Sequence, residues 1–543
     1  MDIRQQLHAA IKRLGADVPF VELEVPRVKE HGDLSTPVAM TLARTLKRPP
    51  RSIAEEIARE LEQWQIFSSI EVKGPGFINF RFKREYLVEQ LKEILTNTER
   101  YLRPYMGDGK RVQIEFVSAN PTGPLHLGHG RGAAFGAALC NLLQRAGFDV
   151  EKEYYINDAG RQVQLLGESI YARYRELLES EYTFPEDGYQ GQYIYDIAEE
   201  LIKDRGRTYL DREFEEVKEE IINYGVHRML REIEQDLKAF GVTFDRWQSE
   251  RSLYSEGIVH SCLDELKERD LLYEKDGALW FRASEFGDEK DRVVIKQDGT
   301  YTYFASDIGY HWFKLRRGFD ELINIWGADH HGYIPRIRAV LKALGQPDEK
   351  LNIILVQMVN LLRGGKPVQM SKRKGEFVTL REVIEEVGPD ITKFIFLTRK
   401  ADSHLDFDIE VARKESSENP VFYVQYAYAR ISSIFRKAKE RGAEDLVIPG
   451  NLNRLSEDEE VELMKKLSLY PLMFEGAVRA REPHRVTFYL QELASLFHSY
   501  YNRHRVLTDD PQDARARLSL CSAIKRVLDE GLSILGVTAP EKM

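Results

Sequence analysis

Cysteine is scarce in this sequence, and its scarcity excludes several classes of protein. The 543 residues include only Cys140, Cys262 and Cys521, which lie far apart and form no CxxC pair. A disulfide framework and a cysteine-rich zinc site are therefore not expected. Free cysteines are typical of a reducing compartment, so we expect a cytoplasmic protein.

Long apolar runs and a strong excess of positive charge are also missing. The most apolar stretch, LNIILVQMVNLL at 351–362, is interrupted by Gln357 and Asn360, so no membrane span is expected. The first residues, MDIRQQLHAAIKRL, lack the continuous apolar segment of a secretory signal. A formal net charge of −10 argues against a protein that coats nucleic acid indiscriminately. It leaves room for a shaped RNA held by local basic patches.

The length of the chain predicts two to four domains. Residues 1–105 alternate helical and strand patterns and are typical of a small α+β domain. A strand pattern at 111–118, a glycine-rich loop, a helix and another strand then begin a doubly wound, Rossmann-like α/β domain over 106–415. We expect a charged helical insertion at about 160–290 and an all-α helical bundle over 416–543. No dimerisation device is visible, so we expect a monomer.

The glycine-rich loop, SANPTGPLHLGHGRG at 118–132, places His126 and His129 one helical turn apart with Gly128 between them. Backbone N–H groups at a helix N-terminus bind anions, and two imidazoles add donors for a phosphoryl group. Gly128 lets a flat ring approach the backbone. The loop is neither a dinucleotide G-x-G-x-x-G nor a Walker A sequence. Two alternatives remain: ordinary polar histidines on a tight turn, or a zinc site.

The zinc alternative would draw further ligands from His330 and His331, but no cysteine cluster completes it, and we expect no metal site. A second basic sequence, PVQMSKRKGEF at 367–377, contains Met370, Ser371 and Lys372. A lysine on such a loop can close on a triphosphate, although a charge run of this kind is also common on solvated surface loops.

The combination of HLGH and MSK resembles the signature motifs of class I aminoacyl-tRNA synthetases. Longer sequences resemble arginyl-tRNA synthetase in particular. They are YFASDIGY (303–310), WGADHHGYIPR (326–336), NPVFYVQYAYARI (419–431), LFHSYYNRHRVL (496–507) and LGVTAPEKM (535–543). HGDLSTPVAM and GPGFINF resemble that family's N-terminal domain, which contacts tRNA. The similarity covers nearly the whole chain and is weakest over 175–230.

This resemblance implies that the chain joins L-arginine to the α-phosphate of ATP, with Mg²⁺, and passes the arginyl group to tRNA(Arg). The two histidines and Lys372 would contact the ATP phosphates, and Gly128, Met370 and Ser371 would lie against the nucleotide. Members of the family usually bind tRNA before they activate arginine. Many class I enzymes have lysine where this chain has Gln369, and either Arg373 or Lys374 is a candidate replacement.

A pocket for arginine must satisfy a planar cation with five donors, which requires carboxylates. The resemblance assigns this role to Glu115, Asn120, Tyr303, Asp307 and, from the N-terminal domain, Asn79. Tyr303 and Asp307 share one face if their segment is helical. The alternative is that Tyr303 packs in a core and Asp307 caps a helix. A site of this kind discriminates without proofreading, so no editing domain is expected.

Aromatic and basic residues are interleaved in the C-terminal region, as expected where RNA bases stack on side chains. The family reads the anticodon with this region, and Tyr426 and Tyr501 are the candidates for stacking, unless they belong to the core. Three rival functions remain at this stage. They are an adenylate-forming enzyme that uses no RNA, a non-catalytic RNA-binding relative, and the same class of enzyme acting on another amino acid.

Overall fold

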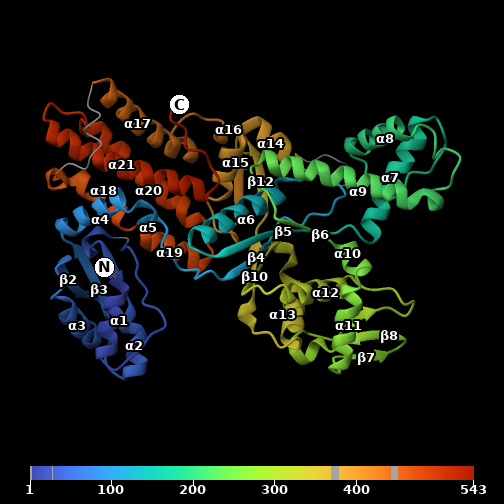
Figure 1. Cartoon of the computed structure of the whole chain (residues 1–543), viewed down its shortest axis with the longest axis horizontal. Coiled ribbons are helices and arrows are strands. Elements are labelled where there is room, and N and C mark those ends of the chain that lie inside the picture. Colours follow the sequence, from blue (N-terminus) through green and yellow to red (C-terminus); the bar gives the residue numbers. More distant parts are fainter. Residues whose placement is uncertain (1–2, 27, 369–377, 442–450) are drawn as a thin grey trace.

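The computed structural model describes residues 3–26, 28–368, 378–441 and 451–543 (Figure 1). At its centre lies a five-stranded sheet with the strand order β11-β10-β4-β5-β6, and every neighbouring pair is parallel. The strands are β4 (Arg111–Glu115), β5 (Asp149–Ile156), β6 (Arg246–Ser249), β10 (Glu321–Gly327) and β11 (Leu351–Val356). The predicted doubly wound α/β fold is therefore confirmed.

The order of the strands fixes where a ligand can bind. The chain runs from β4 outward through β5 to β6, and then returns to the other side of β4 to form β10 and β11. In sheets of this kind, ligands bind beyond the carboxyl ends of the strands where the winding direction reverses. That point lies between β4 and β10. Helix α6 (Leu127–Arg145) follows the carboxyl end of β4 after the glycine-rich loop.

Two insertions interrupt the central domain. Between β5 and β6 lie α7 (Arg161–Leu177), α8 (Gln192–Arg205) and α9 (Phe214–Ala239), which extend to the upper right of Figure 1. Between β6 and α12 (Tyr303–Arg316) lie α10 (Glu250–Ser255), α11 (Ile258–Glu268) and an antiparallel sheet of β7 (Leu272–Lys275), β8 (Ala278–Phe281) and β9 (Arg292–Ile295). This differs from the single helical insertion expected over about 160–290. β6 has only four residues with no apolar alternation, so its place beside β5 is decided by backbone pairing.

A smaller sheet follows β11 in the sequence. It contains β12 (Val359–Arg363), β13 (Lys366–Pro367) and β14 (Leu405–Asp408), with β12 in the middle. Helices α14 (Leu380–Val387) and α15 (Pro389–Phe396) connect β13 to β14, and α16 (Ile409–Ala412) follows. Helix α13 (Ile334–Ala343) lies between β10 and β11 in the sequence.

The terminal regions form one α+β unit and one helical unit. The first contains β1 (Leu34–Thr36), β2 (Phe67–Lys73) and β3 (Phe77–Phe82), which form an antiparallel sheet, with α1 (Ile3–Arg13), α2 (Val38–Leu46), α3 (Pro50–Leu61), α4 (Arg84–Thr96) and α5 (Thr98–Leu102). The second contains α17 (Pro420–Glu440), α18 (Asp458–Ser468), α19 (Tyr470–Ala480), α20 (His484–Arg503) and α21 (Pro511–Ile534). Ion pairs of 2.9 Å join Lys29 to Glu462 and Lys465 to Asp33, so the N-terminal unit docks on the helical unit.

The three cysteines are buried and free, as expected without a disulfide framework. Among the residues that the structure describes, no helix is both long enough and apolar enough to cross a membrane.

Candidate active site

The two predicted histidines stand at the N-terminus of α6. His126 is the N-cap residue, and its Nδ1 accepts a hydrogen bond from Gly128 N at 3.1 Å. His129 Nδ1 accepts from the backbone N–H of His126 at 3.3 Å, which closes a capping box. The two rings stack with centroids 3.7 Å apart. Because both Nδ1 atoms are acceptors, each neutral ring has its proton on Nε2, where it can donate to a phosphate.

The glycines of this loop allow close packing. A Cβ on Gly128 would lie 3.0 Å from His126 Cε1, so a side chain there would displace the imidazole. A Cβ on Gly130 would lie 2.6 Å from Leu380 Cδ1, so this glycine lets α6 and α14 pack together. The density of glycine therefore serves the histidine pair and the contact with α14.

Met370, Ser371 and Lys372 lie outside the described residues, but both flanks of their segment are defined. Val368 N donates to Leu361 O at 2.9 Å and so continues the sheet that contains β12. On the other side, Thr379 forms an antiparallel bridge with His126, and Leu380 N donates to Leu125 O at 2.7 Å. The chain that follows the lysine segment is thus hydrogen-bonded to the histidine loop.

The helical insertion holds the same loop from the other side. Tyr193 Oη donates to Thr122 O at 2.8 Å, and Asn120 Nδ2 donates to Gln162 Oε1 at 2.6 Å. The charged insertion, for which the sequence suggested no role, therefore supports the loop through side chains of α7 and α8.

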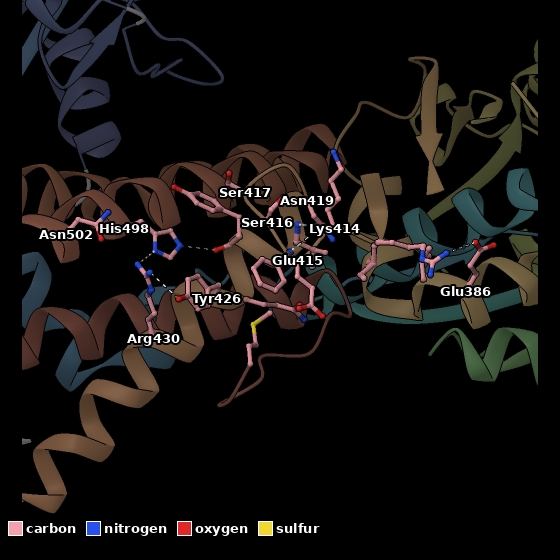
Figure 2. Close-up of a pocket in the computed structure, with 18 residues that line it drawn as sticks. Glu386, Lys414, Glu415, Ser416, Ser417, Asn419, Tyr426, Arg430, His498 and Asn502 are labelled. Atoms are coloured by element: carbon pink, nitrogen blue, oxygen red, sulfur yellow. Dashed lines mark hydrogen bonds and ion pairs between the residues drawn. The ribbon is translucent and has the colours of Figure 1, made fainter. Parts of the chain in front are cut away.

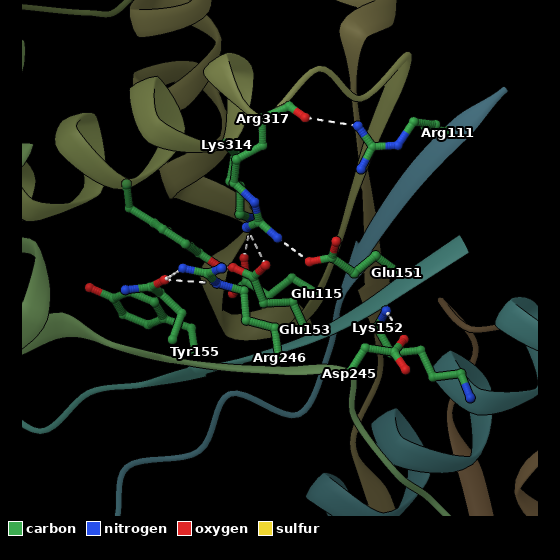
Figure 3. A network of polar contacts seen from close by, with 12 residues as sticks. Arg111, Glu115, Glu151, Lys152, Glu153, Tyr155, Asp245, Arg246, Lys314 and Arg317 are labelled. Carbon is green, nitrogen blue, oxygen red and sulfur yellow. Dashed lines mark hydrogen bonds and ion pairs between the residues drawn. The ribbon is translucent and has the colours of Figure 1, made fainter. Parts of the chain in front are cut away.

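The first predicted acid, Glu115, lies at the carboxyl end of β4 and already has a cation beside it (Figure 3). Lys314, whose side chain is fully buried, forms an ion pair with Glu115 Oε2 and donates to Asn324 Oδ1 at 2.9 Å. Ser118 Oγ donates to the other oxygen, Glu115 Oε1, at 3.1 Å. The negative charge of Glu115 is thus largely balanced within the protein.

Asp307 and Glu250 are the acids of the pocket without a direct ion-pair partner in the described part of the chain, although the charges of Lys314 and Arg336 also act on Asp307. Asp307 lies on α12, where Tyr333 Oη donates to its Oδ2, and burial together with the charge of Glu115 raises its pKa from 3.8 to about 6. Glu250, only 3% exposed at the start of α10, has its pKa raised from 4.5 to about 7 by burial and by the charge of Asp307. Neither carboxylate forms an ion pair with any residue in the described ranges. Enclosed carboxylates without a counterion are costly and favour a cationic ligand.

A tyrosine completes this pocket. Tyr155 Oη is buried and has no hydrogen-bond partner in the described part of the chain. Burial raises its pKa well above the usual value, and the nearby charges of Glu250, Asp307 and Glu115 add to this effect. Sequence reasoning missed both Tyr155 and Glu250. Tyr155 is the penultimate residue of β5 and Glu250 directly follows β6, so the carboxyl-edge rule for parallel strands was the signal that could have identified them.

Two further residues are expected to bind arginine, Tyr303 and Asn79, and only Tyr303 lies near the pocket. Tyr303 is 58% exposed at the start of α12, and its ring packs close to Gly160. Tyr303 and Asp307 lie one turn apart on the same helix, so the helical condition for their shared face is met.

Asn79 does not join them. It is 6% exposed within β3, where it pairs with Ser35 and Glu71, and Figure 1 shows this sheet on the far side of the molecule from α10 and α12. The assignment of Asn79 to the arginine pocket is therefore corrected. Its domain docks on the C-terminal helices, which the N-terminal sequence pattern does not reveal.

The zinc alternative gains no support. His330 and His331 are exposed in a short 3-10 helix (Ala328–Tyr333). Over the described ranges, no group of three or more His, Cys, Asp or Glu residues is placed to hold a metal ion.

The two predicted RNA-stacking tyrosines lie together around one arginine. The Arg430 guanidinium lies 4.3 Å from the Tyr426 ring centroid and 5.1 Å from that of Tyr501. Arg430 also donates to Tyr426 Oη at 3.1 Å and contacts His498 Nδ1 at 3.3 Å (Figure 2). Tyr426, Arg430 and His498 line a pocket of about 1050 Å³ between α14, the segment 413–419, α17 and α20. Tyr501 lies behind Arg430 and does not line it.

Comparison with known proteins agrees with this arrangement. Three family models match the chain: the arginyl tRNA synthetase N terminal domain over residues 1–82, the class I (R) tRNA synthetase catalytic domain over 90–401, and the DALR anticodon binding domain over 424–543. Proteins named arginine–tRNA ligase from Syntrophotalea carbinolica and Aquifex aeolicus are 52% and 48% identical. The first alignment covers 99% of this chain and 97% of the relative, and the second covers 100% and 99%.

Solved structures give the same result. A Campylobacter jejuni structure assigned as an arginyl-tRNA synthetase is 38% identical with a TM-score of 0.78, covering 85% of this chain and all of that one. The Thermus thermophilus arginyl-tRNA synthetase is 24% identical with a TM-score of 0.79, covering 100% of this chain and 99% of that one, and shows the shared fold. Family models, close relatives and fold thus agree over the full length: the chain belongs to the arginyl-tRNA synthetase family.

Proposed function

We propose that this chain attaches L-arginine to tRNA(Arg) in two steps, through an arginyl-adenylate formed from ATP. One observation supports this proposal above all others. Two carboxylates that form no ion pair in the described residues, Asp307 and Glu250, lie at the same edge of the sheet as the helix that begins with His126 and His129. A cation-binding pocket beside an anion-binding helix N-terminus fits arginine and ATP together.

The guanidinium of arginine would lie between Asp307 and Glu250, with the Tyr155 hydroxyl as a further partner. Tyr303 and Asn120 would close the rim of the pocket. The charge of Glu115, although paired with Lys314, would still attract the guanidinium weakly. A wrong amino acid would leave these acids buried and unpaired, and sites of this kind discriminate by roughly 10⁴ or more. This supports the absence of an editing activity.

In the first step, a carboxylate oxygen of arginine attacks the α-phosphorus of ATP and pyrophosphate leaves. The Nε2–H groups of His126 and His129 would donate to phosphate oxygens as negative charge develops on them. Lys372 would add a positive charge from the segment that ends at the Thr379 bridge, with Met370, Ser371 and Gly128 against the nucleotide. Mg²⁺ would enter with ATP as part of the nucleotide substrate.

In the second step, the terminal ribose hydroxyl of tRNA attacks the arginyl carbonyl, AMP leaves, and the hydroxyl proton passes to the departing phosphate or to solvent. Tyr426 and Arg430, on the wall of the C-terminal pocket, suit an unpaired RNA base and a phosphate, and Tyr501 would hold Arg430 from behind. We take the chain to act as a monomer in the cytoplasm, where ATP and tRNA are available.

The decisive experiment is charging of tRNA with each of the twenty amino acids in turn. Arginine alone should be attached, and pyrophosphate exchange with arginine should increase when tRNA is added. Efficient charging with a different amino acid would overturn the specificity. Exchange that needs no RNA, without any charging, would favour an adenylate-forming enzyme of another kind. The absence of both reactions would favour a non-catalytic RNA-binding protein.

A further inference from the structure

Arg131 occupies an unusual position two residues after His129 on α6. Its side chain is among the largest that are fully buried in the described residues, with 1% of the residue exposed. No carboxylate within the described ranges forms an ion pair with it. The histidine and acid pockets described above do not use this cation.

All of the recorded hydrogen bonds of Arg131 go to backbone carbonyls in two distant loops. Nη1 donates to Gln357 O and to Ser403 O, each at 2.8 Å, and Nη2 donates to Lys400 O at 2.8 Å. Gln357 N in turn donates to Ala401 O at 2.8 Å, so the two loops are bonded to each other. One guanidinium thus joins α6 to two loops that are far from it in the sequence.

These loops lead directly into the smaller sheet. The loop at Gln357 connects β11 to β12, and the loop at 400–403 connects α15 to β14, the parallel partner of β12. A second set of hydrogen bonds joins this region to the first turn of α6, through the Thr379 bridge to His126 and the Leu380–Leu125 hydrogen bond. His126 and Arg131 are five residues apart, or roughly 8 Å along the helix axis. Hydrogen bonds therefore join the helix to the unit formed by β12–β14 and α14 at both of these places, in addition to the packing of Leu380 on Gly130.

Maintaining a charge in such a place is costly. Burial lowers the pKa of Arg131 from 12.5 to about 10, and only the field of Asp402 opposes this effect. An apolar side chain of similar volume would avoid the desolvation cost, but it would leave three carbonyls without their donor. The planar guanidinium is the side chain that can satisfy all three at fixed angles.

We propose that Arg131 is a positioning residue for adenylate formation: it fixes the unit of β12–β14 and α14 relative to the histidine turn of α6. This inference rests on the proposed function. In that reaction the Lys372 segment, which connects β13 to α14 in the sequence, and the histidines would both act on one triphosphate, and a misplacement of about 1 Å between them costs on the order of 10²-fold in rate. The arginine pocket is built from β4, β5, α10 and α12 and does not use the hydrogen bonds of Arg131.

The test compares Arg131→Met and Arg131→Lys with the unaltered chain in tRNA-dependent pyrophosphate exchange. For the Met variant we expect kcat/KM for ATP to fall about 100-fold, while calorimetric affinity for arginine changes less than about threefold. Lysine retains a charge and three donors, so it should recover part of the loss. The matched control is Lys393→Met, which removes another buried cation that donates to a backbone carbonyl, that of Gly536. It should lower the melting temperature without a selective effect on ATP.

Three results would overturn the proposal. The first is an Arg131→Met variant with unaltered ATP kinetics. The second is an Arg131→Met variant that loses kcat/KM for ATP and affinity for arginine equally, by the same factors as Lys393→Met, when both variants have lost the same amount of melting temperature. The third is a lysine variant no more active than the methionine variant. If the Met variant does not fold, Arg131→Lys alone is the test. A selective loss of kcat/KM for ATP in this variant supports the proposal, and unaltered ATP kinetics overturn it. If the unaltered chain shows no arginine-dependent exchange, the proposed function fails, whatever the variants do.

Discussion

The affinity for arginine should depend on pH in a way that Asp307 and Glu250, the two carboxylates with raised pKa values, determine. In the arginine-free protein the pKa of Asp307 is raised to about 6 and that of Glu250 to about 7. A bound guanidinium stabilises the ionised forms and lowers both values, so arginine binding should release protons at pH values below these pKa values. Arginine must therefore bind more weakly as the pH falls through about 7 and then about 6.

The size of this effect follows from the two shifts. At a pH of about 5.5, a group with a pKa near 7 reduces binding about 30-fold and a group with a pKa near 6 about fourfold, because each unit corresponds to 1.36 kcal/mol. If both must ionise, the dissociation constant for arginine should rise about 100-fold between pH 8 and pH 5.5. Since the two groups lie close together, the steps belong to the pair rather than to either residue.

Glu250→Gln separates the contributions. It should abolish the upper step and weaken arginine binding at a pH of about 8 by roughly 10- to 100-fold, as expected for loss of one charged partner. The assay is calorimetric titration with arginine across the pH range, in buffers of different ionisation enthalpy so that proton release is counted. Glu256→Gln is the matched control, since Glu256 is exposed near the end of the same helix.

A dissociation constant that stays flat between these pH values would refute the reasoning. So would a Glu250→Gln variant that binds arginine as tightly as the Glu256→Gln control. Affinity for ATP, measured over the same range, should not show the same two steps, and a parallel loss would point to general acid unfolding.

Three further predictions concern other parts of the molecule. His129→Ala should reduce kcat in pyrophosphate exchange by about 10²-fold while arginine affinity is retained, and equal loss of both would contradict its placement on the phosphates. Replacing both Tyr426 and Tyr501 by alanine should weaken tRNA binding at least about tenfold, measured by filter binding, because a stacked base contributes about 1–3 kcal/mol. Arginine and ATP binding should not change, and unchanged tRNA affinity would refute the assignment. Lys314→Met strands Glu115 in the core and should lower the free energy of unfolding by about 3–5 kcal/mol, measured by chemical denaturation, and a neutral result would show that Glu115 rehydrates.

The local parts of the active site could be predicted from the sequence because they depend on neighbours in the chain. The position of His126 and His129 one turn apart at the start of α6 needs only a three-residue spacing after a strand. Tyr303 and Asp307 share a helical face for the same reason, since residues four apart lie on one side. The parallel order of the central sheet follows from alternating strand and helix patterns, whose crossover rules leave few topologies.

Other parts were decided only by the tertiary structure, because burial and field depend on residues that are remote in sequence. Glu250 and Asp307 are separated by α11 and a complete antiparallel sheet, yet each raises the cost of charging the pocket. The sequence does not indicate that Lys314, 199 residues away, is buried against Glu115 and balances its charge. The resemblance placed Asn79 in the pocket, whereas the sheet that contains it lies across the molecule from α10 and α12. Spacing along the chain sets which face a side chain occupies, whereas its charge balance is set by what packs against that face.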